Sequence, residues 1–191
     1  MAVLHRCKDS TESGTLDLSR CTLLQVGDPA NFVNITNSCP FQLPDGVMYM
    51  MKNHKIINCI LSNNLLSTIQ DDFGMYFSNL QMLDLSFNSL SIIPRKILHC
   101  KQLKSVNISH NSFVAFPSIL LELENMTEIN VENNFIADVG EEGLGSHERL
   151  ELVNLEGNPV SQRSRERLGR VTRVRILLSE QKLEDWEDLE I

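Results

Sequence analysis

Residues 80–94 read Leu-Gln-Met-Leu-Asp-Leu-Ser-Phe-Asn-Ser-Leu-Ser-Ile-Ile-Pro. Apolar residues and one asparagine in this stretch follow the spacing L-x-x-L-x-L-x-x-N-x-L, which is a known repeat signature. The positions are filled by Leu80, Leu83, Leu85, Asn88 and Leu90. One copy of such a pattern carries little weight, but the same spacing recurs along the chain. We therefore take the stretch as one unit of an internal repeat.

Five copies share one register. Copies start 23 residues after Leu80, 23 after that and 24 after that, and another starts 24 residues before it. The asparagine of the signature is present in each copy, as Asn64, Asn88, Asn111, Asn134 and Asn158. A weaker copy precedes them, with Leu16, Leu18 and Leu23 in place and Cys21 where the signature allows either asparagine or cysteine. The sequence thus predicts about six repeats.

Each position of the repeat predicts a structural role. The alternating Leu-x-Leu segment indicates a short strand with its apolar residues facing inward and the residues between them facing outward. The asparagine is expected to pair buried backbone groups of adjoining coils, so the five asparagines should form a ladder. The return half carries a second apolar set, which predicts a short helical or irregular convex side. The expected fold is an α/β solenoid with a concave parallel sheet.

The chain divides into four predicted parts. Residues 1–12 read as an N-terminal extension, 13–160 as the solenoid, 161–179 as a C-terminal cap and 180–191 as an acidic tail. An insertion at about 25–40 is rich in turn residues, which is typical of either a functional loop or a disordered bulge. Within the cap, we expect Leu168 and Val171 to face the stack. The tail either floats free or folds back onto the arginine-rich cap.

Composition narrows the class of protein. The net charge is −8, with 25 acidic against 17 basic residues, which disfavours a general nucleic-acid or anionic-membrane binder. No segment has the apolar length of a signal peptide core or a membrane span. Five cysteines, an odd number, and the absence of a C-x-x-C pair favour free thiols. We expect a monomer in the cytoplasm, with entry into the nucleus left open.

No catalytic constellation is visible in the sequence. The five histidines are dispersed without the spacing of metal ligands, there is no glycine-rich phosphate loop, and no nucleophile stands beside a base. The sequence therefore predicts a protein that is not an enzyme. It also predicts no cofactor, no metal and no small-molecule substrate.

Side chains that the repeat directs outward from the strands are the candidate binding residues for a partner protein. They are Ile60, Met82, Asp84, Phe87, Asn107, His110, Glu128, Asn130 and Glu132. Three of them, Ile60, Met82 and Phe87, are apolar and lie on adjacent repeats, which favours an interaction site. The alternative is that single exposed apolar residues are common on protein surfaces and have no function. The serines at 62, 86 and 109 are also expected to face outward.

Over residues 16–160, the register of the repeats resembles that of the leucine-rich repeat family. Repeat lengths and the segment Glu128-Ile-Asn-Val-Glu-Asn-Asn-Phe-Ile-Ala-Asp-Val resemble a small cytoplasmic member of that family. The resemblance implies a right-handed solenoid, a role as an adaptor or scaffold in protein–protein interaction, and no catalytic residues. The insertion at 25–40 departs from the family pattern.

A different class of function is open at the C-terminus. Six arginines lie at 163, 165, 167, 170, 173 and 175, and they could bind nucleic acid or an anionic membrane. The competing interpretation is a solvated cap whose charge the acidic tail neutralises.

The register also predicts which asparagines carry the fold. Asn111 is expected in the buried ladder, so Asn111→Ala should cost roughly 1 to 3 kcal/mol. Asn63 precedes ladder residue Asn64 and is expected to face solvent. We therefore expect Asn63→Ala to leave stability nearly unchanged.

Overall fold

The computed structural model describes residues 6–7, 10, 13–20 and 55–180. The predicted insertion at 25–40 lies outside the described residues, within the range 21–54. The tail from 181 onward also lies outside them. Most of the predicted extension at 1–12 also lies outside them.

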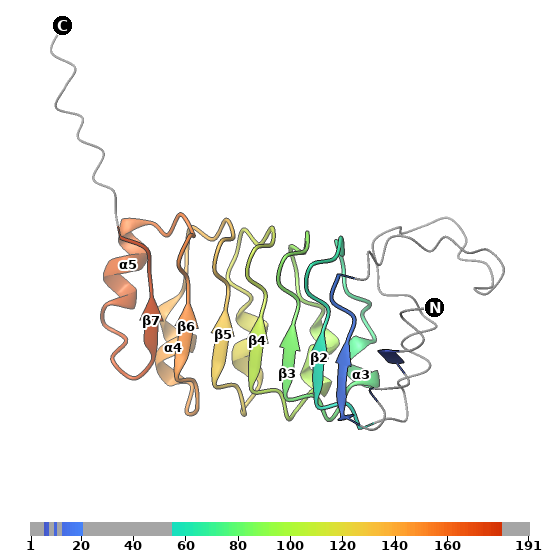
Figure 1. Ribbon diagram of the computed structural model, residues 1–191. Coiled ribbons are helices and arrows are strands. Elements are labelled where there is room, and N and C mark those ends of the chain that lie inside the picture. The colour runs from blue at the N-terminus through green and yellow to red at the C-terminus, as the bar shows by residue number, and fades with distance from the viewer. Residues whose placement is uncertain (1–5, 8–9, 11–12, 21–54, 181–191) are drawn as a thin grey trace, which may run out of the picture.

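One parallel sheet runs through the described part of the chain, in the order β1 to β7 (Figure 1). Each strand is three residues long, because only the alternating segment of each repeat can pair before the chain turns. The strands are β1 (Thr15–Asp17), β2 (Asn58–Ile60), β3 (Met82–Asp84), β4 (Ser105–Asn107), β5 (Glu128–Asn130), β6 (Leu152–Asn154) and β7 (Arg175–Leu177). The parallel sheet predicted from the repeat is confirmed.

Register between neighbouring strands follows the repeat without slippage. Leu83 pairs with Val106, and Val106 pairs with Ile129, so equivalent apolar residues lie side by side. All three are buried. The apolar residue at the centre of each strand therefore points into the core, while the first and third residues point to the other face.

Short helices return the chain behind the sheet. They are α3 (Phe73–Tyr76), η1 (Arg95–His99), η2 (Ser118–Glu122), α4 (Glu141–Ser146) and α5 (Gln162–Leu168). Two are single 3₁₀ turns that begin directly after Pro94 and Pro117, where the fixed φ of proline suits a helix start. These elements are too short to be stable alone, so each depends on packing against the sheet and its neighbours.

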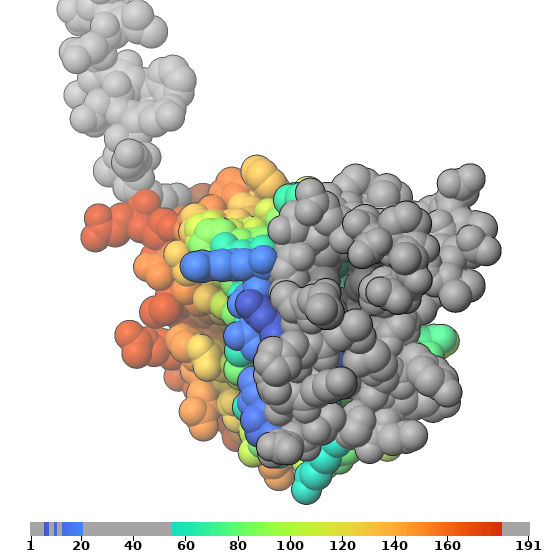
Figure 2. All heavy atoms as spheres, turned by 45° about the vertical axis from the view of Figure 1, so that its right-hand side comes forward, coloured from blue at the N-terminus to red at the C-terminus, as the bar shows by residue number. Residues whose placement is uncertain are grey.

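The core lies between the strands and these helices as one continuous cluster. Phe73, Phe77 and Phe113 are its largest fully buried side chains. In the space-filling view, the described coils follow one another as layers of colour from blue through green to orange (Figure 2). Because each coil covers the apolar face of the next, the core has no break along the stack.

Buried asparagines connect successive coils. The Asn111 amide donates to the carbonyls of Leu85, Ile108 and Ser109 at 3.0 to 3.1 Å, and its Oδ1 accepts from the Leu90 N–H at 2.8 Å. Equivalent bonds are made at Asn88, Asn134 and Asn158, and Asn64 makes the donor half of the set. One side chain thus satisfies backbone groups of two coils.

The last described coil ends in α5 and β7. Ser161 caps α5 by accepting from the Ser164 N–H at 3.3 Å. The buried Ser164 hydroxyl donates to Asp138 and accepts from the Val139 N–H, which fixes the helix to the preceding coil. Leu168 is buried against the stack. β7 pairs with β6 in the same register as the other strands.

Candidate binding surface

The face of the sheet away from the core carries the predicted partner-binding residues, and we call it the open sheet face. It comprises the first and third residues of each strand and the residues two and three positions after the strand ends. It corresponds to the concave face of the sequence prediction. Successive strands lie about 4.8 Å apart, so neighbouring coils bring equivalent side chains together.

Aspartate and asparagine occupy the third strand position in almost every repeat, and their side chains hold the backbone. Asp84 Oδ1 accepts from the Ser86 N–H at 3.0 Å, and Asn107 Oδ1 accepts from the Ser109 N–H at 3.1 Å. The same contact is made by Asp17, Asn130 and Asn154. We call these five residues the Asx column. Three predicted binding residues, Asp84, Asn107 and Asn130, therefore also stabilise the turn after their strand.

Ile60 interrupts the Asx column. It lies at the third position of β2, in register with Asp17 on one side and Asp84 on the other. An isoleucine side chain has no oxygen for the Ser62 N–H, so this coil lacks the bond that its neighbours make. The side chain is half-buried on the open sheet face. The repeat has thus exchanged a backbone cap for an apolar side chain at this position.

A second column, formed by the residue three positions after each of the strands β1 to β6, has left-handed backbone conformation. The residue just before each ladder asparagine has a φ between 51° and 55° at Asn63, Phe87, His110 and Asn133, and 69° at Gly157. Asparagine and glycine adopt this conformation readily, but a bulky side chain does so at a cost. Arg20, three residues after β1, has a φ of 54° at the same position, so three described residues of this column, Arg20, Phe87 and His110, are neither asparagine nor glycine.

Phe87 and His110 stack on each other. Their ring centroids are 4.0 Å apart and the planes are 12° from parallel. Phe87 remains 48% exposed, so the stack leaves one broad apolar face in solvent. The His110 Nε2 lies 3.2 Å from the Asn133 amide nitrogen, which ties the pair to the next coil.

The predicted apolar group is only partly exposed. Met82 and Ile60 are half-buried, whereas Phe87 stands out from the surface. The sequence predicts that the serines at 62, 86 and 109 face outward, but all three are buried, so they offer little surface to a partner.

Glutamates occupy the C-terminal half of the open sheet face. Glu128 begins β5 and is exposed, and Glu156 follows β6 and is also exposed. Glu132 follows β5, and its two carboxylate oxygens accept from the amides of Asn133 at 3.1 Å and Asn154 at 3.3 Å. These neutral donors fix the carboxylate in place without neutralising it.

Two pKa effects bear on this face and its core. Burial opposes ionisation of Asp17, but hydrogen bonds from Ser19 and the nearby Arg6 leave the pKa of Asp17 lowered overall. Below the face, burial raises the pKa of the Cys100 thiol to about 12 and raises that of Cys59 further still. The two thiols therefore stay protonated and act as small apolar groups.

Half of the arginines in the predicted cap bond to the protein itself. Arg165 donates to the carbonyls of Val160 and Ser179, and Arg173 donates to that of Glu148. Arg167 donates to the Ser164 hydroxyl. These contacts hold the guanidinium groups against the last coil, so part of their hydrogen-bonding capacity is used within the protein.

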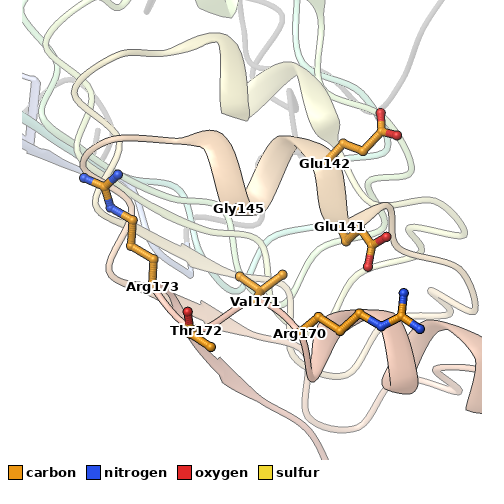
Figure 3. Close-up of a pocket in the computed structure, with 7 residues that line it drawn as sticks. All are labelled: Glu141, Glu142, Gly145, Arg170, Val171, Thr172 and Arg173. Atoms are coloured by element: carbon orange, nitrogen blue, oxygen red, sulfur yellow. The ribbon is translucent and has the colours of Figure 1, made fainter.

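A shallow hollow of about 360 Å³ lies between α4 and the segment after α5 (Figure 3). Glu141 and Arg170 carry their charged groups at one end of it, and Arg173 extends from the other end. Carboxylates and guanidinium groups are mixed in the lining, so the hollow offers no single charge to a ligand.

Two further searches cover only the described residues. Among them, no helix is long and apolar enough to cross a membrane. No group of three or more histidine, cysteine or acidic side chains within the same residues could hold a metal ion.

The left-handed column is the feature that the sequence prediction missed. A signal for it exists, because Asn63, Asn133 and Gly157 occupy equivalent positions and all favour positive φ. Reading that column would have marked Arg20, Phe87 and His110 as exceptions. The Asx column could have been found in the same way from its repeated aspartate and asparagine.

Comparison with known proteins agrees with this architecture. Residues 59–113 match the family described as Leucine rich repeat. A solved leucine-rich repeat protein of Leptospira interrogans matches with a TM-score of 0.62 and 24% sequence identity, over 71% of this chain and 34% of that chain. The chain thus spans about a third of that protein's length. No sequence among the curated proteins matches the chain. The fold is a leucine-rich repeat solenoid.

Proposed function

We propose that this leucine-rich repeat solenoid is a non-catalytic adaptor or scaffold that binds a partner protein on its open, concave sheet face. The observation that carries the proposal is the exposed Phe87–His110 stack, built on strained backbone. Strain of this kind persists where the surrounding structure imposes it, and it gathers at functional sites. We further propose that the protein is a small cytoplasmic member of the leucine-rich repeat family and acts as a monomer in the cytoplasm or nucleus.

The apolar residues around the stack extend the surface. Ile60 takes a position where the Asx column would stabilise the turn, and Met82 lies on the neighbouring strand β3, in register with Asn58. Large apolar and aromatic side chains commonly dominate the affinity of protein interfaces. The face thus combines three apolar side chains that the fold does not require with polar groups that it does.

The arginine segment at 163–175 does not favour binding to nucleic acid or to an anionic membrane as a second function. Arg165, Arg167 and Arg173 are engaged with groups of the protein itself. Arg170 lines the hollow between α4 and the segment after α5 together with Glu141 and Glu142.

Affinity capture with the full chain tests the proposal. The Met82→Glu, Phe87→Glu double variant places two charges among the apolar residues of the open sheet face. The matched control is Ile92→Glu, Val114→Glu, since both residues are exposed and lie outside the strands. We expect partners to be lost from the first variant and retained by the second. Equal capture by the wild-type chain and the first variant would contradict binding on this face.

A further inference from the structure

The open sheet face is divided into an apolar half and an acidic half. Ile60, Met82 and Phe87 lie on or just after β2 and β3. Glu128, Glu132 and Glu156 lie on or just after β5 and β6. The His110 ring stands between the two halves, stacked on Phe87 and near Asn133. A ligand that covered the face would therefore meet two different chemistries in a fixed order.

The charge of the acidic half is free to act on a ligand. The ion pairs among the described residues involve Asp17, Asp72 and Asp138, so none neutralises the three glutamates. Asp84 adds a fourth carboxylate beside Met82, and its one described contact is with the Ser86 N–H. Arg175 begins β7, in register with Leu152 of β6, and is the basic residue that borders the acidic half. The balance over β3 to β6 is clearly negative.

The spacing between the two halves fits an extended chain. From β2 and β3 to β5 and β6 is three strand spacings, or about 14 Å. An extended polypeptide covers that distance with about four residues. A single short segment lying across the strands could therefore contact both halves at once.

We infer that the open sheet face takes an extended, basic polypeptide segment. One bulky apolar side chain of that segment lies on Ile60, Met82 and Phe87, and its lysine or arginine side chains lie over Glu128, Glu132 and Glu156. The inference rests on the proposed function and adds the chemistry of the partner. Charge complementarity sets the orientation, because the reversed segment would place its cations over a half with one carboxylate, Asp84, in place of three.

The same charges exclude other occupants. An acidic peptide, a nucleic acid or an anionic membrane would bring negative charge against the glutamates and Asp84. Repulsion between like charges across an interface disfavours such partners. A wholly apolar segment would bury carboxylates without partners, which is also costly.

Selection from a phage-displayed library of random twelve-residue peptides on the full chain tests the inference. We expect a consensus with one large apolar residue and, about four positions away, lysine or arginine. The selected peptide should bind the Glu128→Gln, Glu132→Gln, Glu156→Gln variant about five- to fifty-fold more weakly, as three partly exposed ion pairs would give. Binding should also weaken as salt rises.

A charge-matched control separates local from overall electrostatics. The Glu122→Gln, Glu124→Gln, Glu148→Gln variant removes the same charge from exposed positions away from the sheet, and should bind the peptide within two-fold of wild type. Peptides that lose binding in the Phe87→Glu variant but lack basic residues would overturn the inference and leave the proposed function standing. Peptides indifferent to Phe87→Glu, or no enrichment, would contradict both.

Discussion

Two residues of the open sheet face stand where neighbouring coils use a side chain better suited to the backbone. Phe87 occupies the left-handed position that Asn63 and Asn133 fill in other coils, and Ile60 occupies the Asx column. Each exchange gives up a local stabilisation of about 1 kcal/mol, as αL strain or a missing hydrogen bond. Both exchanges place an apolar side chain on the same face. At the residue scale, this is the argument for a binding role.

The asparagines of the ladder, in contrast to Ile60 and Phe87, are expected to stabilise the fold. Asn111→Ala should lower the free energy of unfolding by about 3 kcal/mol, because the Leu90 N–H and the carbonyls that Asn111 serves lose their partner in a buried site. Equilibrium unfolding in denaturant measures the loss. A loss below about 0.5 kcal/mol would mean that Asn111 is not a structural residue.

Asn63→Ala is not a neutral control for Asn111→Ala. The expectation that Asn63→Ala is nearly silent is wrong on structural grounds, because φ at Asn63 is 55° and alanine is strained there. We expect Asn63→Ala to cost about 1 kcal/mol and Asn63→Gly to cost less, since glycine adopts this conformation freely. Asn63→Gly is therefore the proper comparison for Asn111→Ala.

At the scale of the elements, helices α3 and η1 approach each other closely. A Cβ atom added at Gly74 in α3 would lie 2.0 Å from the Lys96 carbonyl oxygen in η1. Backbone cannot yield as a side chain does, so we expect Gly74→Ala to destabilise the protein by about 2 kcal/mol or more. Thermal or denaturant unfolding would measure this change.

Gly145 in α4 is the matched control for Gly74, because a Cβ there would meet nothing within 4 Å. Gly145→Ala should raise stability by about 0.5 to 1 kcal/mol, since alanine is the better helix former. Similar effects of the two substitutions would contradict the close approach of α3 and η1.

Much of the fold could be predicted from the sequence at this scale. The Leu-x-Leu segments gave the strand positions and their register, because apolar spacing decides which side chains face the core. The contact between Gly74 and Lys96 could not be predicted, since it depends on how two coils pack. The burial of Ser86 was missed as well, because repeat spacing does not specify how far neighbouring coils cover a side chain.

At the scale of the whole molecule, the sheet and the asparagine ladder form one stack of coils. The candidate binding residues lie on the open sheet face of this stack. Stability is then the sum of the coils and the contacts between them. The candidate site could be predicted only in outline. Repeat spacing marks the outward positions, but the Asx bonds and the Phe87–His110 stack depend on backbone angles that spacing does not specify.

The buried thiols make stability depend on alkaline pH. Burial raises the pKa of Cys59 and Cys100 in the folded protein above the ordinary value of 9.0. Their stabilisation is therefore fully present below pH 9 and falls as pH rises toward 12, because the unfolded chain ionises first. We expect unfolding free energy to decline through this window.

Other groups also titrate at high pH, so the comparison is between variants. In Cys100→Ala, the decline of unfolding free energy between pH 9 and 11 should be less steep than in the wild-type chain, whatever the change in stability at pH 7. An unchanged slope would show that the Cys100 thiol is not the source.

The most direct test of the central claim needs no partner. If Ile60 and Phe87 serve binding and not the fold, the Ile60→Asn, Phe87→Asn variant, which uses the chain's own alternatives at both positions, should keep its stability. We predict a free energy of unfolding within about 1 kcal/mol of wild type, or above it, because a hydrogen bond and relief of αL strain offset the lost stacking. A loss of about 3 kcal/mol or more, as for a core phenylalanine, would contradict the account.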